Sequence, residues 1–249
     1  MTRRLLLVRH GVTEWNQAGR YQGHQDVPLS ETGREQAGRV ADRLRSETIT
    51  AAYSSDLRRA RETASIILGE RNVPLQLTPV LREMAFGGWE GLTAREIAER
   101  YPAEWDAWIR NPVLARPPGG EDLGELNARV TDFFRSMVQA PRTASAQPDW
   151  FSYRAAGEST DHTSGTVLLV SHGGTVRALL AHLFEVRIEL YWRFGIRPAS
   201  VTILDLYPEG AVAEVIGDTS HLDVPSAELR VPGPTERGTR HLEPGTDAP

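Results

Sequence analysis

The stretch Leu5-Leu6-Leu7-Val8-Arg9-His10-Gly11 is a run of four apolar residues that ends abruptly in an arginine, a histidine and a glycine. A short continuous apolar run is typical of a strand that is buried on both faces of a parallel sheet. The stretch Val167-Leu168-Leu169-Val170-Ser171-His172-Gly173 repeats this arrangement almost letter for letter. The two stretches therefore predict two buried strands, each followed by a histidine and a glycine.

Helices and a further strand are predicted around these two stretches. After a loop over 19–28, Thr32-Gly33-Arg34-Glu35 offers a capping box at the start of an amphipathic helix. Ile49 to Tyr53 predicts another strand, and Ser54-Ser55 opens a helix whose apolar stripe reaches residue 68. Val176 to Phe184 predicts the helix that follows the later histidine. Strands and helices therefore alternate along the chain.

The last predicted strands form a hairpin. Ala199 to Leu206 alternates between apolar and polar residues, Pro208-Glu209-Gly210 predicts a turn, and Ala211 to Ile216 completes a hairpin at the sheet edge. The whole pattern predicts an α/β fold, a three-layer sandwich with a mostly parallel central sheet flanked by helices.

The middle of the chain departs from this pattern. Residues from about 84 to 137 contain short predicted helices that are punctuated by Gly and Pro and that carry Trp89, Trp105 and Trp108. We interpret this segment as an inserted helical cap. Its tryptophans either form the core of the cap, which is the more common arrangement, or face a hydrophobic or sugar-like ligand.

Two further segments fit poorly into a core. Residues 141–165 are rich in small and polar residues and predict a mobile insertion. Its aromatic cluster over 150–153 is costly to leave in water, so we expect it to pack onto the domain or onto a second subunit of a homodimer. Residues 222–249 are rich in Pro, Gly and charge and predict a disordered tail. A single domain over 1–221 follows.

Composition excludes several classes of protein. The 249 residues include 28 Lys and Arg against 33 Asp and Glu, a formal net charge of −5, so no global basic field attracts nucleic acid or an anionic membrane. The absence of cysteine excludes disulfides, zinc-thiolate sites and thiol catalysis. No apolar run approaches the length of a membrane-spanning helix, and the expected location is the cytoplasm.

The two histidines at the strand ends are the leading candidates for chemistry. In open α/β sheets, ligands bind beyond the carboxyl ends of the parallel strands, where His10 and His172 are predicted to lie. Gly11 and Gly173 follow them and permit close approach of the backbone to a ligand. If the two strands are neighbours, both imidazoles face one pocket. The alternative is that a histidine at a strand end is merely structural.

A metal site is disfavoured because Arg9 sits beside His10 and a fixed cation repels a metal dication while it attracts an anion. Arg58, Arg59 and Arg61 lie in the first turns of a predicted helix, whose free N–H groups also attract anions. Guanidinium groups suit phosphoryl oxygens, so at least one of these three is expected to face a phosphate while another is solvated.

A neutral imidazole can act as a nucleophile toward phosphorus, but the leaving oxygen then needs a proton donor. Glu83, at the start of the glycine-rich segment, is the leading carboxylate. Asp56, Glu90 and Glu121 are weaker candidates.

These residues resemble the histidine phosphatase superfamily, also called phosphoglycerate mutase-like, over residues 3 to 221 apart from the insertion. The resemblance lies in four ordered motifs: Leu7-Val8-Arg9-His10-Gly11-Val12-Thr13-Glu14-Trp15-Asn16, Ser55-Asp56-Leu57-Arg58-Arg59-Ala60-Arg61-Glu62-Thr63-Ala64, Leu81-Arg82-Glu83 followed by Phe86-Gly87-Gly88-Trp89-Glu90-Gly91, and Val170-Ser171-His172-Gly173-Gly174.

The resemblance implies the fold predicted above, with the cap over the active site, and a role for each matching residue. It implies a phosphorylated nucleophile, His10; phosphate-pocket residues, Arg9, Arg59 and His172; a general acid and base, Glu83; and further phosphate-binding positions, Asn16, Gln22 and Gly23. The resemblance also implies that the phosphatase branch needs neither a metal nor an organic cofactor. The substrate would be a small phosphorylated metabolite, such as a sugar, glycerate or ribazole phosphate.

Two alternatives stay open. The first is the mutase branch, which returns the phosphoryl group to another oxygen. Mutases resemble one another in a Glu-Arg-His-Tyr-Gly motif with a later Lys and Arg pair, whereas residues 83–87 here are Glu-Met-Ala-Phe-Gly and residues 84–125 contain no Lys and no adjacent Arg pair. The second is a catalytically silent protein that binds phosphorylated ligands.

Overall fold

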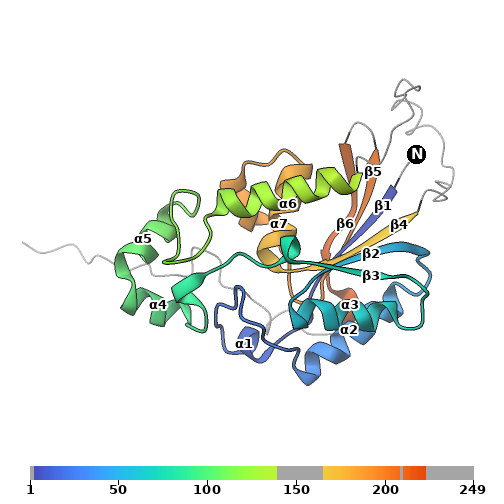
Figure 1. Cartoon of the computed structure of the whole chain (residues 1–249), viewed down its shortest axis with the longest axis horizontal. Coiled ribbons are helices and arrows are strands. Elements are labelled where there is room, and N and C mark those ends of the chain that lie inside the picture. Colours follow the sequence, from blue (N-terminus) through green and yellow to red (C-terminus); the bar gives the residue numbers. More distant parts are fainter. Residues whose placement is uncertain (1–2, 139–164, 208–209, 223–249) are drawn as a thin grey trace, which may run out of the picture.

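The computed structural model describes residues 3–138, 165–207 and 210–222. Its centre is a six-stranded sheet with the order β3-β2-β4-β1-β5-β6 (Figure 1). The strands are β1 (Arg3–Arg9), β2 (Ile49–Ser55), β3 (Leu75–Thr78), β4 (Thr166–Ser171), β5 (Val201–Tyr207) and β6 (Gly210–Asp218).

The two predicted apolar strands lie side by side at the centre of this sheet. β1 pairs with β4 in parallel, with Leu5 opposite Val167 and Arg9 opposite Ser171. β2 is parallel to β4 and to β3, whereas β5 and β6 form an antiparallel hairpin that continues from β1. The expected mostly parallel sheet with an edge hairpin is confirmed.

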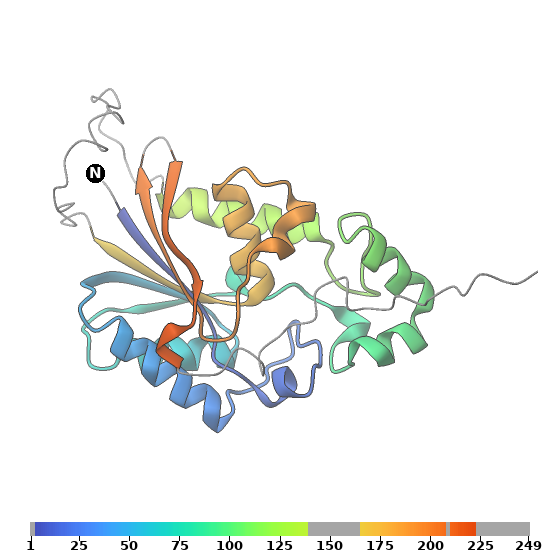
Figure 2. The ribbon, with the colours of Figure 1, turned by 180° about the vertical axis from the view of Figure 1, so that it is seen from behind.

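Helices cover both faces of the sheet, as the sandwich prediction requires. α2 and α3 lie on one face, and α6 and α7 lie on the other (Figures 1 and 2). The helices are α1 (Glu14–Gln17), α2 (Glu31–Arg43), α3 (Arg58–Leu68), α4 (Ala94–Arg100), α5 (Pro102–Arg110), α6 (Leu123–Val138) and α7 (Gly173–Leu183), with short 3-10 turns η1 (Pro79–Leu81), η2 (Gly87–Trp89), η4 (Ile188–Arg193) and η5 (Ser220–Leu222).

Successive side chains of the central strands point to opposite faces of the sheet and contribute to two separate hydrophobic cores. Leu5 and Leu7 of β1 pack toward α6 and α7, where they join Val130 and Leu179. Leu6, next to them in sequence, packs on the other face against α2 and α3. All of these side chains are buried, because a strand covered on both faces needs apolar residues at successive positions.

Four predicted boundaries were wrong. The helix expected from the capping box at 32–35 begins two residues earlier, because Ser30 is its N-cap and accepts a hydrogen bond from Gly33 N. The strand expected over 49–53 runs on to Ser55, and α3 begins only at Arg58. The helix expected from Val176 begins at Gly173. β3 was not predicted, because its four residues carry no continuous apolar run.

The predicted cap segment divides into two parts. α4 and α5 project beyond the carboxyl end of the sheet, whereas α6 packs along α7 (Figure 1). Trp89 is fully buried, with its ring centroid 5.6 Å from the centroids of Trp105 and Trp108. The tryptophans therefore form the core of the cap, as the more common of the two arrangements predicts.

The predicted insertion over 141–165 lies outside the described residues except for Gly165, and the predicted tail over 222–249 except for Leu222. The tail boundary was also wrong, by one residue, because Leu222 belongs to η5 and is buried in the core. Among the described helices, none combines the length and apolar character that crossing a bilayer requires.

Two glycines let the loop after β1 touch the first turn of α2. A Cβ on Gly11 would lie 2.3 Å from Gly33 O, and a Cβ on Gly33 would lie 2.1 Å from Val12 O. Ser30 strengthens the same contact, since its hydroxyl donates to Val12 O. α2 therefore fixes the loop that follows His10.

We expect Gly33→Ala to lower the free energy of unfolding by about 1–3 kcal/mol, because the backbones must separate to admit the methyl group. Gly38, in the same helix, is the matched control, since a Cβ there meets nothing within 4 Å. Gly38→Ala should raise stability by roughly 0.5–1 kcal/mol, the helix preference of Ala over Gly. Urea unfolding of both variants measures the difference, and equal effects would contradict the close contact.

Candidate active site

His10 and His172 meet at the carboxyl end of the sheet. Each directly follows one of the paired strands, and His10 N donates to Ser171 O, which extends the β1–β4 ladder by one bond. The ring centroids are 5.1 Å apart, and the side chains are 2% and 0% exposed. The expectation that both imidazoles face one site is therefore met.

A hydrogen bond fixes the tautomer of His10. Its Nδ1 lies 2.7 Å from Gly11 O, and a carbonyl oxygen only accepts, so Nδ1 carries the proton. Burial, followed by the charges of Arg59 and Arg9, lowers the pKa of His10 well below its ordinary value. His10 is therefore neutral at physiological pH, and its Nε2 bears the free electron pair.

Arg59, in the first turn of α3, lies beside the two histidines. It is 1% exposed, whereas Arg58 and Arg61 on the same helix are exposed. Its Nε donates to His172 Nδ1 at 3.2 Å. Neutral His172 therefore carries its proton on Nε2, a buried donor without a partner among the described residues. The pKa of His172 is also well below its ordinary value, chiefly because of burial.

Arg9 and Arg59 are held by carbonyl groups. Arg9 Nη1 donates to Ile196 O at 2.8 Å, and Arg59 donates to Gly23 O and Gln25 O. Burial lowers the pKa of each guanidinium to about 10, with the charge of Arg177 adding to the effect on Arg9. Both guanidinium groups keep their charge at neutral pH. The charge of Glu83 opposes the effect of burial on both guanidinium groups, but no ion pair with a carboxylate is recorded for either of them among the described residues.

Arg177 is a third guanidinium beside the site, and sequence reasoning missed it. It donates to Phe194 O at 2.9 Å and to Ile196 O at 3.4 Å, so it shares the Ile196 carbonyl with Arg9. A Cβ on Gly173 would lie 3.1 Å from Arg177 Nη1 and 3.3 Å from Arg9 Cζ. The available signal was its spacing of four residues from Gly173, which places both on one helix face.

Glu83 approaches the histidines from the segment after η1. Its Oε1 accepts from Met84 N and from Gly174 N, both at 3.0 Å, and its Oε2 lies 3.1 Å from Gly174 N. A Cβ on Gly174 would lie 2.4 Å from Glu83 Oε1, so glycine permits this contact. Gly173 and Gly174 begin α7, whose N-terminal end favours negative charge.

The three weaker carboxylate candidates are engaged elsewhere. Asp56 forms a bidentate ion pair with Arg82, at 2.7 and 2.6 Å. Glu90 accepts from His24 N, Gln25 Nε2 and Phe86 N. Glu121 binds Arg129. Among the four carboxylates considered, Glu83 is the one that contacts the helix start after His172.

The remaining predicted positions, Asn16, Gln22 and Gly23, belong to α1 and to the loop that follows it. Asn16 Oδ1 accepts from Thr13 N and Thr13 Oγ1 in a capping box, which leaves the amide nitrogen of Asn16 as its donor. Gln22 is buried, and its side-chain oxygen has no partner among the described residues. Gly23 has a φ of 51°, and a Cβ there would lie 2.0 Å from Glu90 Oε1. The loop at 22–25 is therefore held between Arg59 and Glu90.

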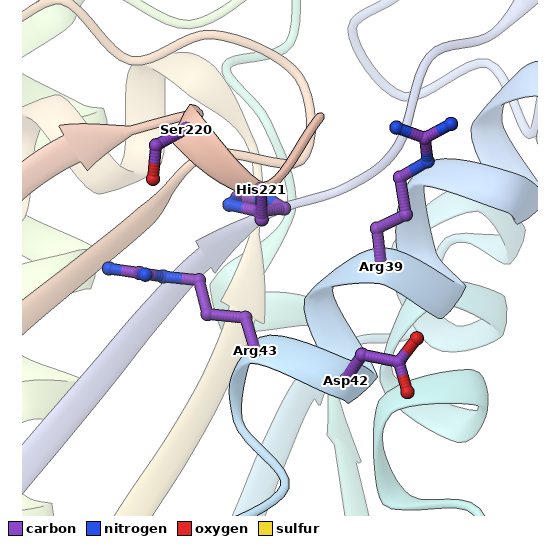
Figure 3. A pocket seen from close by; sticks show the side chains of 5 residues that line it. All are labelled: Arg39, Asp42, Arg43, Ser220 and His221. Carbon is purple, nitrogen blue, oxygen red and sulfur yellow. The ribbon is translucent and has the colours of Figure 1, made fainter. Parts of the chain in front are cut away.

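A separate hollow on the surface involves none of the predicted site residues. Figure 3 shows its lining residues, Arg39, Asp42, Arg43, Ser220 and His221. Arg43 pairs with Asp218 at 2.6 Å, and Arg39 Nη1 donates to Leu222 O at 2.7 Å. These contacts join α2 to the end of the described chain.

The geometry suits a tetrahedral dianion. The charges of the two buried guanidinium groups act on His10, the Nε2–H of His172 has no partner among the described residues, and α7 begins directly after His172. Buried donors without partners are rare in folded proteins, and an anion would supply acceptors for them. Within the described residues, no three His, Asp or Glu side chains form a group suited to a metal ion.

Comparisons with known proteins agree on one family. The model of the histidine phosphatase superfamily (branch 1) matches residues 5–146 and 154–219. The chain is 31% identical to phosphoserine phosphatase 1 of Hydrogenobacter thermophilus, over 88% of this chain and 94% of that protein. It is 36% identical to the "Probable phosphoglycerate mutase GpmB" of Yersinia pestis, over 89% and 96%.

A solved structure extends the similarity to the fold. The mycobacterial glucosyl-3-phosphoglycerate phosphatase, determined with VO3, superimposes with a TM-score of 0.71 at 31% identity, over 87% of this chain and all of that one.

We expect the protein to lose stability as the pH falls from 7 to 5. The unfolded chain binds protons at His10 and His172 below their ordinary pKa of 6.5, whereas the folded protein, with both pKa values lowered, binds fewer. Each histidine then contributes a slope of at most about 1.4 kcal/mol per pH unit.

Urea unfolding at several pH values measures this slope, and the double variant His10→Gln, His172→Gln is the comparison. The slope should become shallower in the variant without vanishing, since burial also lowers the pKa values of His182 and His221. An unchanged slope would show that the two site histidines are not buried in neutral form.

Proposed function

The chain belongs to the histidine phosphatase superfamily, branch 1, and on that premise we propose that it is a phosphomonoester hydrolase that acts through a phosphohistidine intermediate on a small phosphorylated metabolite. The observation that carries the proposal is the state of His10. Its Nδ1 is bound to Gly11 O, which leaves the neutral Nε2 as the free nitrogen, and the charges of Arg59 and Arg9 act on this ring beside His172.

In the first step, His10 Nε2 attacks phosphorus, and the bond from phosphorus to the ester oxygen breaks. The leaving oxygen takes a proton from Glu83, which becomes a carboxylate. The products are the free alcohol and phosphohistidine. Holding the nucleophile and the acid in place avoids the entropic cost of assembling them from solution.

In the second step, a water molecule attacks the phosphorus of phosphohistidine. Glu83 takes a proton from the water, the phosphorus–nitrogen bond breaks, and inorganic phosphate leaves. His10 and Glu83 return to their starting protonation states. Oε1 of Glu83 accepts from Met84 N and Gly174 N, whereas Oε2 accepts from Gly174 N alone, so we assign the mobile proton to Oε2.

The charge that spreads over the phosphoryl oxygens is held by groups of the protein. Arg9 and Arg59 supply two positive charges, and His172 supplies a neutral N–H donor. Preorganised donors of this kind are often the largest contribution to catalysis. We therefore propose that the reaction needs no metal ion.

The substrate class is inferred from the relatives. One is named a phosphatase of phosphoserine and another a phosphatase of glucosyl-3-phosphoglycerate, and both substrates are small metabolites that carry a carboxylate as well as a phosphate. The mutase alternative is kept because a relative at 36% identity carries that name. The lack of Lys and of paired Arg in 84–125 favours the phosphatase.

The test is a panel of phosphoserine, 3-phosphoglycerate and 4-nitrophenyl phosphate, with phosphate release measured for each. We expect release of inorganic phosphate, no net conversion of 3-phosphoglycerate into its 2-phospho isomer, and unchanged rates after exhaustive chelation. His10→Ala should lose at least about a thousandfold in kcat, because the covalent route needs the imidazole.

Arg58→Ala is the matched control, because Arg58 is an exposed cation next to Arg59 in sequence. It should keep most of the activity. Isomer formation without phosphate release would favour the mutase, and activity that disappears on chelation and returns with a divalent cation would overturn the metal-free mechanism.

A further inference from the structure

The segment that carries Glu83 has no regular secondary structure of its own. Residues 83–86 follow η1 without helical or strand hydrogen bonds, so their positions depend on contacts with neighbouring elements. The first set of these contacts comes from α7 and from the end of β4. Ser171 Oγ donates to Leu81 O and Thr175 Oγ1 donates to Arg82 O, both at 2.7 Å.

Arg129 of α6 supplies the second set of contacts. Its Nη1 donates to Val80 O at 2.5 Å and to Arg82 O at 3.0 Å, and its Nη2 donates to Glu83 O at 2.9 Å. One guanidinium therefore binds three carbonyl groups within four residues. A guanidinium has five N–H donors and can bind these carbonyls and a carboxylate at once, whereas a lysine ammonium has only three.

Glu121 completes the arrangement. Both of its oxygens accept from Arg129, at 2.7 Å from Nε and 3.0 Å from Nη2. Its Oε2 also accepts from Ala85 N at 2.8 Å. The ion pair thus holds the backbone on both sides of the Glu83 side chain. Arg129 binds carbonyl groups within residues 80–83, and Glu121 binds the N–H of Ala85.

The partial burial of this pair distinguishes it from the exposed surface pairs among the described residues. The side chains of Arg129 and Glu121 are each 20% exposed. Arg95 and Glu99 form an ordinary surface pair, 88% and 60% exposed, and contact no backbone carbonyl that the structure records. Exposed pairs contribute little to stability, so the backbone contacts of Arg129 point to a different role.

We propose that Arg129 and Glu121 are positioning residues for Glu83, which set the orientation of its carboxyl group toward the leaving oxygen. The inference rests on the proposed function, because it assumes that Glu83 is the proton donor. It extends that function to two residues for which no hydrogen bond to the histidines is recorded in the described part of the chain, although the charge of Arg129 helps to lower the pKa of His172.

The experiment compares how strongly each variant depends on the leaving group. The value of kcat/KM is measured for a series from 4-nitrophenyl phosphate, whose leaving group needs little protonation, to alkyl phosphates, which need a proton donor. Glu83→Gln is the reference, Arg129→Lys and Glu121→Gln are the tests, and Arg135→Ala is the control. Arg135 lies on the same helix and is exposed, paired with Asp132.

We expect Arg129→Lys and Glu121→Gln to lose about 10- to 100-fold on alkyl phosphates and less than about threefold on the aryl ester, in the same direction as Glu83→Gln. Affinity for vanadate should be unchanged, because the phosphate pocket is intact. Arg135→Ala should match the wild type. Two variants are used because one of them could fold poorly.

The outcomes separate the two proposals. If Glu83→Gln depends on the leaving group while both tested variants lose activity equally on all esters, or lose none, the positioning role is wrong and the function stands. If Glu83→Gln itself shows no such dependence, Glu83 is not the acid, and both the mechanism and this inference fail.

Discussion

The parallel pairing of β1 with β4 is the constraint on which the site depends. With Arg9 opposite Ser171, the two strands end at the same level, and the residue after each is a histidine. A shift of the register would separate the imidazoles or turn one of them to the other face of the sheet. The packing of Leu5 and Leu6 in different cores holds β1 from both faces of the sheet.

Above these strand ends, the protein buries three guanidinium groups for which no direct ion pair with a carboxylate is recorded within the described residues, although the charge of Glu83 acts on all three. Arg9 and Arg59 are bound mainly to carbonyl groups, and Arg177 binds carbonyls as well. Exposed arginines such as Arg95 instead pair with nearby carboxylates. Burying unneutralised cations costs free energy, which a bound dianion offsets. The same burial keeps His10 neutral, as its proposed role as a nucleophile requires.

Most of the fold could be predicted from the sequence, because the patterns that specify its strands and helices lie within short stretches of the chain. Continuous apolar runs marked β1 and β4, and the alternation of strands and helices marked the sandwich. The prediction failed where a short element depends on its neighbours. β3 exists because β2 offers it a free edge, and Ser30 rather than Thr32 caps α2 because its hydroxyl also contacts Val12 O.

The sequence by itself determined which chemical groups are present and in what order, including a histidine at each of two strand ends and a carboxylate before the glycine-rich segment. Only the tertiary structure decided their states. It buried Arg59 and left Arg58 and Arg61 in solvent, fixed the proton of His10 on Nδ1, and joined Arg129 to the segment of Glu83. These features depend on burial and hydrogen-bond geometry between residues distant in sequence, which residue type and spacing do not specify.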